Sequence, residues 1–392
     1  MFPGGKFVIA VLALYSVVCG ASSTEVRVRL LGEQTAVDVT GFDLQISAPS
    51  LFMQSDPRTG LRKAHITARG PALWRVVWDK GGAEILHTQS LWVHGQMVRL
   101  GPMPEPDDLE ILGHPGRGLD VIARLELETY LLGVLPAEMP LSWPLEALKA
   151  QAVAARSYVL GQMRERKNEN YDVDASVNSQ VYRYFNDTDA HPAWATKLSR
   201  AVKETAGLVL TDRQSRVLKA YYSADCGCQS EDPKFVWGKV EAFESVKDPS
   251  CRLHPAAHWS LNLERSEVRS KLLAALDLPA TSELRALHVS GRTPSGRVSQ
   301  VVMSAEVKGK AEVHAVSAQE FRHIFGFQRV QSADFSMRWL GDRLEILGQG
   351  SGHGVGLCQT GARALASEGK SHIAILKLYY PRAKLYDLGN LL

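Results

Sequence analysis

The hydrophobic period of the sequence changes part-way along the chain, and this change restricts the folds that the chain can adopt. Over 25–126, short runs of β-branched and aromatic residues alternate with polar residues, and Gly, Pro and Asp separate the runs, as in strands joined by turns. From Leu145 to Val159, apolar residues instead recur at spacings of three and four, which predicts one long helix ending near Arg166. Strands followed by a mixture of helices and strands predict an α+β fold.

The order of these patterns also indicates how the chain is divided. Further helical patterns cover 191–205, 266–276, 317–325 and 359–367, with short strands between them. A chain of 392 residues is long enough for about two domains. We expect a β-rich N-terminal segment over 22–126, a mixed α/β core over 127–392, and a β/α subdomain inserted into that core over 227–345.

Residues 1–21 have the layout of a secretory signal peptide. Lys6 gives a short positive start, residues 7–18 are predominantly apolar, and the small residues Gly20 and Ala21 offer a cleavage point. The apolar run is too short to span a bilayer comfortably. An uncleaved anchor or a buried strand is the alternative. We therefore expect export to the periplasm or the cell-wall space, with no stable membrane span after cleavage.

Composition and charge exclude several classes of protein. Hydrophobic residues make up 45% of the chain and charged residues 22%, which is ordinary globular usage and excludes a disordered, collagen-like or disulfide-dense chain. The net charge is only +3 and no block of like charges occurs, so the sequence predicts no nucleic-acid partner. An uncharged or mixed polymer remains open as a partner.

Three of the four cysteines that follow the signal peptide lie close together in the sequence. In an oxidising compartment, a disulfide from Cys226 to Cys251 is the simplest expectation, because Cys226 and Cys228 are too close for an easy bridge. A structural zinc site is the alternative, and a third outcome is that neither forms. The ligands of such a zinc site would come from Cys226, Cys228, Cys251, His254 and His258.

One carboxylate of the chain has the surroundings of a general acid. Glu138 lies between Pro136 and Pro140, and its other neighbours are mostly apolar. Poor solvation disfavours the charged form, so its pKa should rise, and a raised pKa is what a general acid needs near neutral pH. We expect the prolines to restrict a loop that holds the side chain in place. The alternative is an exposed loop glutamate that caps the following helix.

Two cations on the predicted long helix strengthen the first interpretation. Lys149 and Arg156 are seven residues apart, so they lie on one stripe about 10 Å apart along the axis. Small alanines surround them, which indicates a packed helix that directs charge into a cleft. A solvated helix face is the alternative for each cation taken alone.

The segment 130–160, YLLGVLPAEMPLSWPLEALKAQAVAARSYVL, closely resembles the central motif of the stage II sporulation protein D family, also called the LytB amidase-enhancer family. Other segments that resemble the family follow in the same order: SQVY (179–182), ETAGLVLT (204–211), AYYSADCG (220–227), WG (237–238), GRTPSGRV (291–298) and GHGVGLCQTGARALASEGKSHIAILKLYYP (352–381). The match covers about residue 25 to the C-terminus and is weakest over the β-rich start.

The resemblance implies a lytic transglycosylase that acts on peptidoglycan glycan strands stripped of their stem peptides. Such an enzyme cleaves between N-acetylmuramic acid and N-acetylglucosamine and leaves a 1,6-anhydromuramoyl end. The family's catalytic acid/base glutamate falls on Glu138. Most glycosidases need two carboxylates, but here the attacking group is the substrate's own C6 hydroxyl, so one residue can donate and then accept a proton. No cofactor is required. The alternative is a non-catalytic glycan-binding module that activates a cell-wall amidase.

The glycine-rich segment around His353 is a second candidate part of the site. Its glycines permit close approach of a ligand, and a sugar-contacting loop or a tight structural turn would both fit. Here the chain departs from the family pattern, since an aromatic residue is usual at Thr360 and Ser is usual at Cys358. The lost ring would remove a sugar-stacking surface, and CGC in place of the usual CGG adds Cys228 as a free thiol or metal ligand. The residues expected to line the cleft are Lys149, Arg156, Ser179, Gln180, Tyr182, Tyr222, Ser223, His353 and Gln359.

Overall fold

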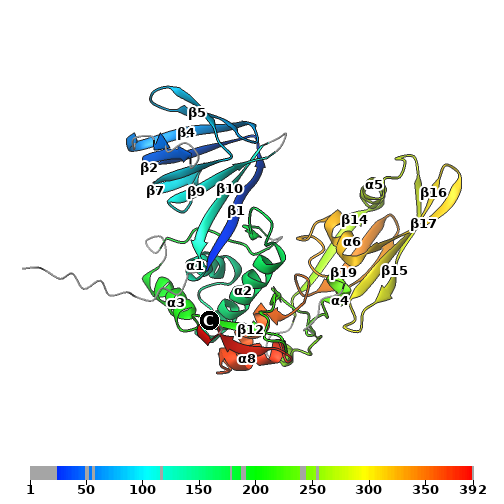
Figure 1. Cartoon of the computed structure of the whole chain (residues 1–392). Helices are drawn as coiled ribbons and strands as arrows, with labels where there is room; N and C mark the ends of the chain where they lie inside the picture. Colours follow the sequence, from blue (N-terminus) through cyan, green and yellow to red (C-terminus); the bar gives the residue numbers. More distant parts are fainter. Residues whose placement is uncertain are drawn as a thin grey trace, which may run out of the picture.

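The computed structural model of the chain describes residues 24–48, 53–54, 58–114, 118–176, 179–186, 191–238, 244–252 and 256–390 (Figure 1). The predicted signal peptide and His254, one of the candidate zinc ligands, lie outside the described residues. Among the described helices, none is both long enough and apolar enough to cross a bilayer.

The described residues up to Glu126, together with one later strand, form a large, mostly antiparallel sheet, at the top left of Figure 1. Its path runs β11-β1-β10-β9-β7-β2-β4-β5-β6, with β3 beside β2 and β8 beside β7. Alternation explains the strands: in β2, for example, Val37, Val39 and Ile46 are buried and polar residues lie between them. The strands are β1 (Glu25–Gln34), β2 (Ala36–Ala48), β3 (Met53–Gln54), β4 (Arg58–Gly70), β5 (Leu73–Trp78), β6 (Ala83–His87), β7 (Ser90–Leu100), β8 (Met103–Pro104), β9 (Asp108–Gly113), β10 (Leu119–Glu126) and β11 (Val173–Asp174).

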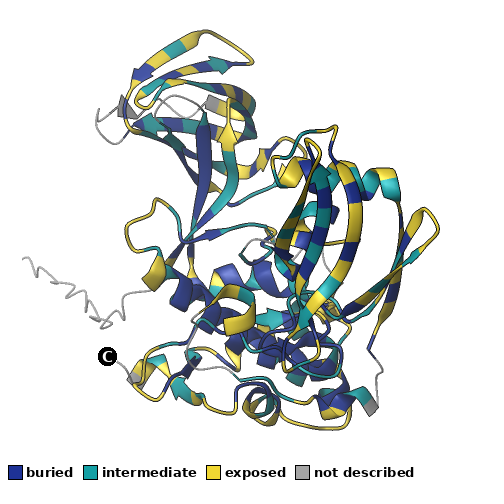
Figure 2. Cartoon of the chain, turned by 90° about the vertical axis from the view of Figure 1, so that its right-hand side faces the viewer, coloured by how far each residue is buried: buried dark blue, intermediate teal, exposed yellow. Residues whose placement is uncertain are grey.

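Helices follow the sheet, which confirms the predicted α+β class. The long helix α2 (Leu145–Glu165) is buried over most of its length. It contacts α3 and also α1 (Leu127–Glu138), α7 (Gln359–Ser367) and α8 (His372–Tyr379). It ends where the spacing of apolar residues predicts. Pro144 precedes it, and its N-terminus has no side-chain cap. Figure 2 shows this helical centre mostly dark blue, whereas the outer hairpins carry more yellow. The helix α3 covers Pro192–Lys203.

The segment that precedes Glu138 is a helix, and the expected loop is wrong. Helix α1 (Leu127–Glu138) begins directly after β10 and includes Pro136 in its last turn. Its buried residues Leu127, Tyr130, Leu131, Val134 and Leu135 follow the spacing i, i+3, i+4, i+7 and i+8 of an apolar helix stripe. The prolines obscured that stripe, since Pro136 has no N–H and removes one hydrogen bond of the helix, which forms nevertheless.

A second hydrophobic core lies between Trp259 and Ile346 and is built from two three-stranded sheets and two helices, on the right of Figure 1. One sheet has the order β14-β19-β18 and the other the order β15-β16-β17. The inserted subdomain over 227–345 remains a prediction in its exact bounds. The elements are β14 (His258–Glu264), α5 (Arg265–Ala275), β15 (Glu283–Arg292), β16 (Val298–Val307), β17 (Lys310–Ser317), α6 (Ala318–Phe325), β18 (Phe335–Leu340) and β19 (Arg343–Gln349).

The second core lies in the sequence between two short strands that are neighbours in space. Strands β13 (Tyr222–Ser223) and β20 (Leu357–Cys358) pair in parallel, with Tyr222 opposite Leu357 and Ser223 opposite Cys358. This pairing places residues before the second core next to residues after it, and the candidate site is built on it. The remaining elements are β12 (Leu208–Thr211), α4 (Lys234–Trp237), η1 (Pro249–Arg252), α7 (Gln359–Ser367), α8 (His372–Tyr379), β21 (Lys384–Asp387), which pairs with β12, and η2 (Leu388–Asn390).

Candidate active site

Glu138 ends helix α1 and is partly buried, and donors from three separate segments converge on its carboxylate. The backbone N–H of Val181 donates to Oε1 at 2.9 Å. The side chains of Tyr222 and Gln359 also hydrogen-bond to the carboxylate. The donors therefore come from the segment after β11, from β13 and from the first residue of α7, and the β13–β20 pairing brings the last two together.

Burial raises the pKa of Glu138, as its apolar neighbours in the sequence predict. The hydrogen bonds from Val181, Tyr222 and Gln359 oppose this shift, because each of them stabilises the charged carboxylate. Desolvation thus favours the neutral acid. The three donors stabilise the carboxylate that forms when the proton leaves. Such an environment suits a group that must both give and take a proton.

A buried network fixes the direction of the Tyr222 hydroxyl. Gln180 Nε2 donates to the hydroxyl of Tyr222 at 3.1 Å and to the carbonyl of Ala155 at 3.2 Å. Gln180 Oε1 accepts a hydrogen bond from the hydroxyl of Tyr130 at 2.9 Å. Because Tyr222 accepts from Gln180, its own proton is available to Glu138. Gln180, expected to bind substrate, is fully buried and instead positions Tyr222.

Sequence reasoning missed two members of this network. Tyr130 orients Gln180, and Gln151 accepts a weak hydrogen bond from Gln359 Nε2 at 3.5 Å. Gln151 is also fully buried, which is unusual for its residue type. A polar residue in the middle of an alanine-rich helix stripe is the signal that could have identified it.

Gly133 allows the chain that carries Val181 to pack closely on α1. A Cβ atom at Gly133 would lie 2.3 Å from Cε2 of Tyr182 and 2.7 Å from the carbonyl oxygen of Arg183. The ring of Tyr182 is buried and stacks on Tyr130 with ring centroids 5.7 Å apart. Tyr182, expected to contact substrate, is therefore a packing residue that holds the N–H of Val181 against Glu138.

The two cations of α2 are both engaged within the protein. Arg156 has no exposed surface, and it donates to both oxygens of Glu128 (2.8 and 2.6 Å) and to the carbonyl of Leu208 (3.0 Å). These contacts favour a structural role for Arg156, and its expected role in substrate binding stays a prediction. Lys149 pairs with Glu146 at 2.9 Å and with Glu204 at 2.7 Å. The ion pair of Arg156 is thus buried, whereas those of Lys149 involve partly exposed glutamates.

The glycine-rich loop is a tight turn that supports β13. Ser223 Oγ donates to the carbonyl of Ser351 at 3.0 Å and accepts the N–H of Gly354 at 3.0 Å. The Nδ1 atom of His353 accepts the N–H of Val355 at 3.0 Å, and burial together with nearby arginines lowers the pKa of His353 to about 3. His353 is therefore neutral near neutral pH. These contacts favour the structural alternative for both Ser223 and His353.

A stacked aromatic pair beside this loop, formed by exposed Trp237 and half-buried Tyr221, was not singled out as functional from the sequence. Trp237 is 45% exposed and stacks on Tyr221 with ring centroids 4.2 Å apart, and it also packs on His353. Tyr221 directly precedes the Glu138 partner Tyr222. Trp237 thus offers a flat apolar face of the type that sugars stack on, at a different position from the aromatic residue missing at Thr360. Ser179, also expected to bind substrate, is partly buried close to Gln180.

The disulfide joins Cys228 to Cys251, with a Cα–Cα distance of 5.5 Å, so the predicted bridge from Cys226 to Cys251 is wrong. Gly227 and Cys228 both have positive φ angles (58° and 75°). The resulting turn points the side chains of Cys226 and Cys228 in different directions, and Cys228 is the one that bonds to Cys251. Cys226 and Cys358 are buried free thiols. The expected zinc ligand set is also not assembled, because the disulfide consumes Cys228 and Cys251 and because His258 is exposed on β14.

The chain is similar to several known proteins. A family model described as "Stage II sporulation protein" matches residues 116–211, and a domain family of unknown function matches 247–356. An uncharacterized protein of Brachyspira hyodysenteriae is 32% identical over 69% of this chain and 69% of its own length. Stage II sporulation protein D of Bacillus subtilis is 28% identical over 68% of this chain and 76% of its own length. An amidase enhancer of Bacillus subtilis is 29% identical over 65% of this chain but only 40% of the enhancer.

Proposed function

Because the chain belongs to the stage II sporulation protein D family, we propose that it is an exported peptidoglycan lytic transglycosylase with Glu138 as its single acid and base. The observation that carries this proposal is the partly buried carboxylate with a raised pKa and three converging hydrogen-bond donors. The substrate would be glycan strands stripped of stem peptides, and the product would end in 1,6-anhydromuramic acid.

In this reaction, neutral Glu138 donates its proton to the oxygen that links N-acetylmuramic acid to N-acetylglucosamine. The glycosidic bond breaks, and the donors from Val181, Tyr222 and Gln359 stabilise the carboxylate that remains. The C6 hydroxyl of the muramic acid then attacks its own C1 and gives its proton back to Glu138. No water is consumed, and Glu138 ends in its starting state.

Two further acids of α1 and α2, Glu128 and Glu146, are held as ion pairs, which supports a one-carboxylate mechanism. Glu128 is bound by Arg156. Although burial opposes the shift, hydrogen bonds from Lys149 and His372 lower the pKa of Glu146 to about 2, so Glu146 stays ionised and cannot act as an acid near neutral pH. The pKa of Glu138, in contrast to that of Glu146, moves in the direction that proton donation needs.

Digestion of peptide-stripped glycan tests the proposal. We expect products with anhydromuramoyl ends, which are lighter by one water than products of hydrolysis and resist borohydride reduction. Mass spectrometry before and after reduction distinguishes the two. Reducing muramic acid ends would show a hydrolase and would contradict the proposed intramolecular attack.

The alternative function is glycan binding that activates an N-acetylmuramoyl-L-alanine amidase, and the similarity to an amidase enhancer favours it. On this alternative, the chain would release no glycan fragments but would bind the strands and accelerate an added amidase. The Glu138→Gln variant would then stimulate the amidase as well as wild type does. Loss of stimulation together with loss of glycan cleavage would support the enzyme.

Replacing Tyr222 with phenylalanine should shift the pH profile of glycan cleavage. The Tyr222 hydrogen bond lowers the pKa of Glu138, so its removal raises that pKa further. Since the acid must be protonated, the fall of kcat/KM with rising pH should move to higher pH in Tyr222→Phe. The matched control is Tyr221→Phe, whose ring stacking on Trp237 is kept and whose profile should follow wild type. An unshifted pH profile in Tyr222→Phe would contradict the claim that the Tyr222 hydroxyl lowers the pKa of the catalytic acid.

A further inference from the structure

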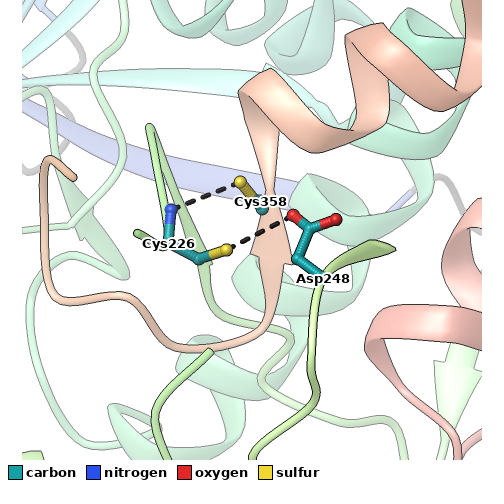
Figure 3. A group of neighbouring side chains, drawn as sticks. All are labelled: Cys226, Asp248 and Cys358. Carbon is teal, nitrogen blue, oxygen red and sulfur yellow. Dashed lines mark hydrogen bonds between the residues drawn. The ribbon is translucent and has the colours of Figure 1, made fainter. Parts of the chain in front are cut away.

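Cys226, Asp248 and Cys358 form a buried cluster that the proposed chemistry does not use (Figure 3). Cys226 lies in the loop after β13, Asp248 directly precedes η1, and Cys358 ends β20. Their side chains are 1%, 6% and 2% exposed, and one ligand atom from each lies within 4.8 Å of the others. Figure 3 shows the two thiols and the carboxylate turned toward one another.

The charge of Asp248 is not balanced by a cation in the described part of the chain. Its carboxylate accepts hydrogen bonds from the hydroxyl of Tyr379 at 2.8 Å, the thiol of Cys226 at 3.3 Å and the backbone N–H of Ser250 at 2.9 Å. The buried cation of this region, Arg297, donates instead to the carbonyl of Cys226 and to Ser295. A buried carboxylate without a cation is costly, and a bound cation would relieve that cost.

The sulfur of Cys358 lies in a cage of polar groups. It accepts the backbone N–H groups of Cys226 at 3.3 Å and Gly361 at 3.4 Å, and the hydroxyl of Thr360 lies 3.3 Å away. Cys358 is also the N-cap of α7, where the helix dipole favours negative charge. These groups suit a thiolate, which is the form of cysteine that binds a metal.

We propose that Cys226, Cys358 and Asp248 bind a Zn²⁺-like soft divalent cation. Two thiolates and a carboxylate are suitable zinc ligands, whereas calcium and magnesium prefer oxygen alone. Binding exchanges the two thiol protons for the ion and releases them to solvent. The hydroxyl of Tyr379 orients the carboxylate, as outer hydrogen-bond partners of metal ligands commonly do. This ligand set shares only Cys226 with the set expected from the sequence.

The cation would brace the strands that carry two partners of Glu138. Cys358 lies opposite Ser223 in the β13–β20 pair. Tyr222 directly precedes Ser223 in the sequence, and Gln359 directly follows Cys358. An ion that joins the Cys226 loop to Cys358 therefore holds both donors in register. Only the effect of the ion on the partners of Glu138 rests on the proposed function. Metal binding itself is measured independently of glycan cleavage.

Metal titration of the mature chain with its Cys228–Cys251 disulfide intact tests the site. Zn²⁺ affinity is measured by competition with a chromophoric chelator, and Co²⁺ substitution reports thiolate ligation through its charge-transfer absorption. We expect a single site in wild type and an affinity loss of at least about tenfold in Cys226→Ser, Cys358→Ser and Asp248→Asn. The matched controls His258→Ala and Cys228→Ser/Cys251→Ser remove ligands of the alternative set and should keep wild-type affinity.

Cys358→Ser is the decisive variant, since serine also caps helices and α7 should keep its N-terminus. Circular dichroism checks that each variant is folded. Unchanged affinity in folded Cys358→Ser would overturn the proposal, as would two free thiols without metal binding in wild type. An intact mass that shows two disulfides, with no thiol available to alkylation, would replace the metal site by a bond between Cys226 and Cys358.

Discussion

Glu138→Gln should lower the rate of anhydromuramoyl product formation by a factor of about 100 to 10,000, the usual contribution of a general acid and base. Glutamine is nearly isosteric and its carbonyl oxygen can still accept the N–H of Val181. It cannot donate a proton to the glycosidic oxygen or take one from the C6 hydroxyl. The measurement is a time course of glycan digestion with both proteins at equal concentration. Products that persist at the wild-type rate would exclude Glu138 as the essential acid.

The stability of Glu138→Gln supplies an independent readout. Because the folded-state pKa of Glu138 is raised, its favourable contribution is present below the unfolded pKa and is lost as pH rises through the folded pKa. Glutamine has no such loss, so the variant should be at least as stable as wild type near neutral pH. The control Glu146→Gln should behave oppositely, keeping activity but losing stability, because ion pairing lowers the pKa of Glu146. Thermal unfolding as a function of pH measures both.

Arg156→Met should destabilise the fold by about 3 kcal/mol, because it leaves Glu128 and the carbonyl of Leu208 without their buried donor. Lys149→Met should cost less than about 1 kcal/mol, since Glu146 and Glu204 are partly exposed and remain solvated. Urea unfolding followed by far-UV circular dichroism measures both free energies of unfolding. The two cations look alike on the helix stripe, so the contrast depends on burial alone.

Arg156→Lys is the matched control for this contrast. Lysine keeps the charge but cannot bind both oxygens of Glu128 in the geometry that Arg156 provides, so its stability should lie between those of wild type and Arg156→Met. Where a variant remains folded, glycan binding should be retained. If an Arg156 or Lys149 variant keeps its stability but loses glycan binding, the replaced cation has a role in substrate binding.

Local patterns were sufficient for most elements and failed where the signal was mixed. The predicted helix over 359–367 coincides with α7, because a glycine-rich turn and a C-terminal glycine frame its apolar stripe. Helix α1 was missed because two prolines near Glu138 outweighed a regular stripe. The Cys226 to Cys251 bridge was wrong because sequence distance says nothing about the direction in which a turn points Cys226 and Cys228.

From its sequence alone, the chain already determined a strand-rich start, a long packed helix and a poorly solvated Glu138, because hydrophobic period and apolar neighbours are properties of adjacent residues. Only the tertiary structure decided which groups meet that acid. Close packing on Gly133 brings Val181 to it. The pairing of β13 with β20, which the second core separates in the sequence, brings Tyr222 and Gln359 to it. Contacts between such distant residues depend on the packing of whole elements, which no local pattern records.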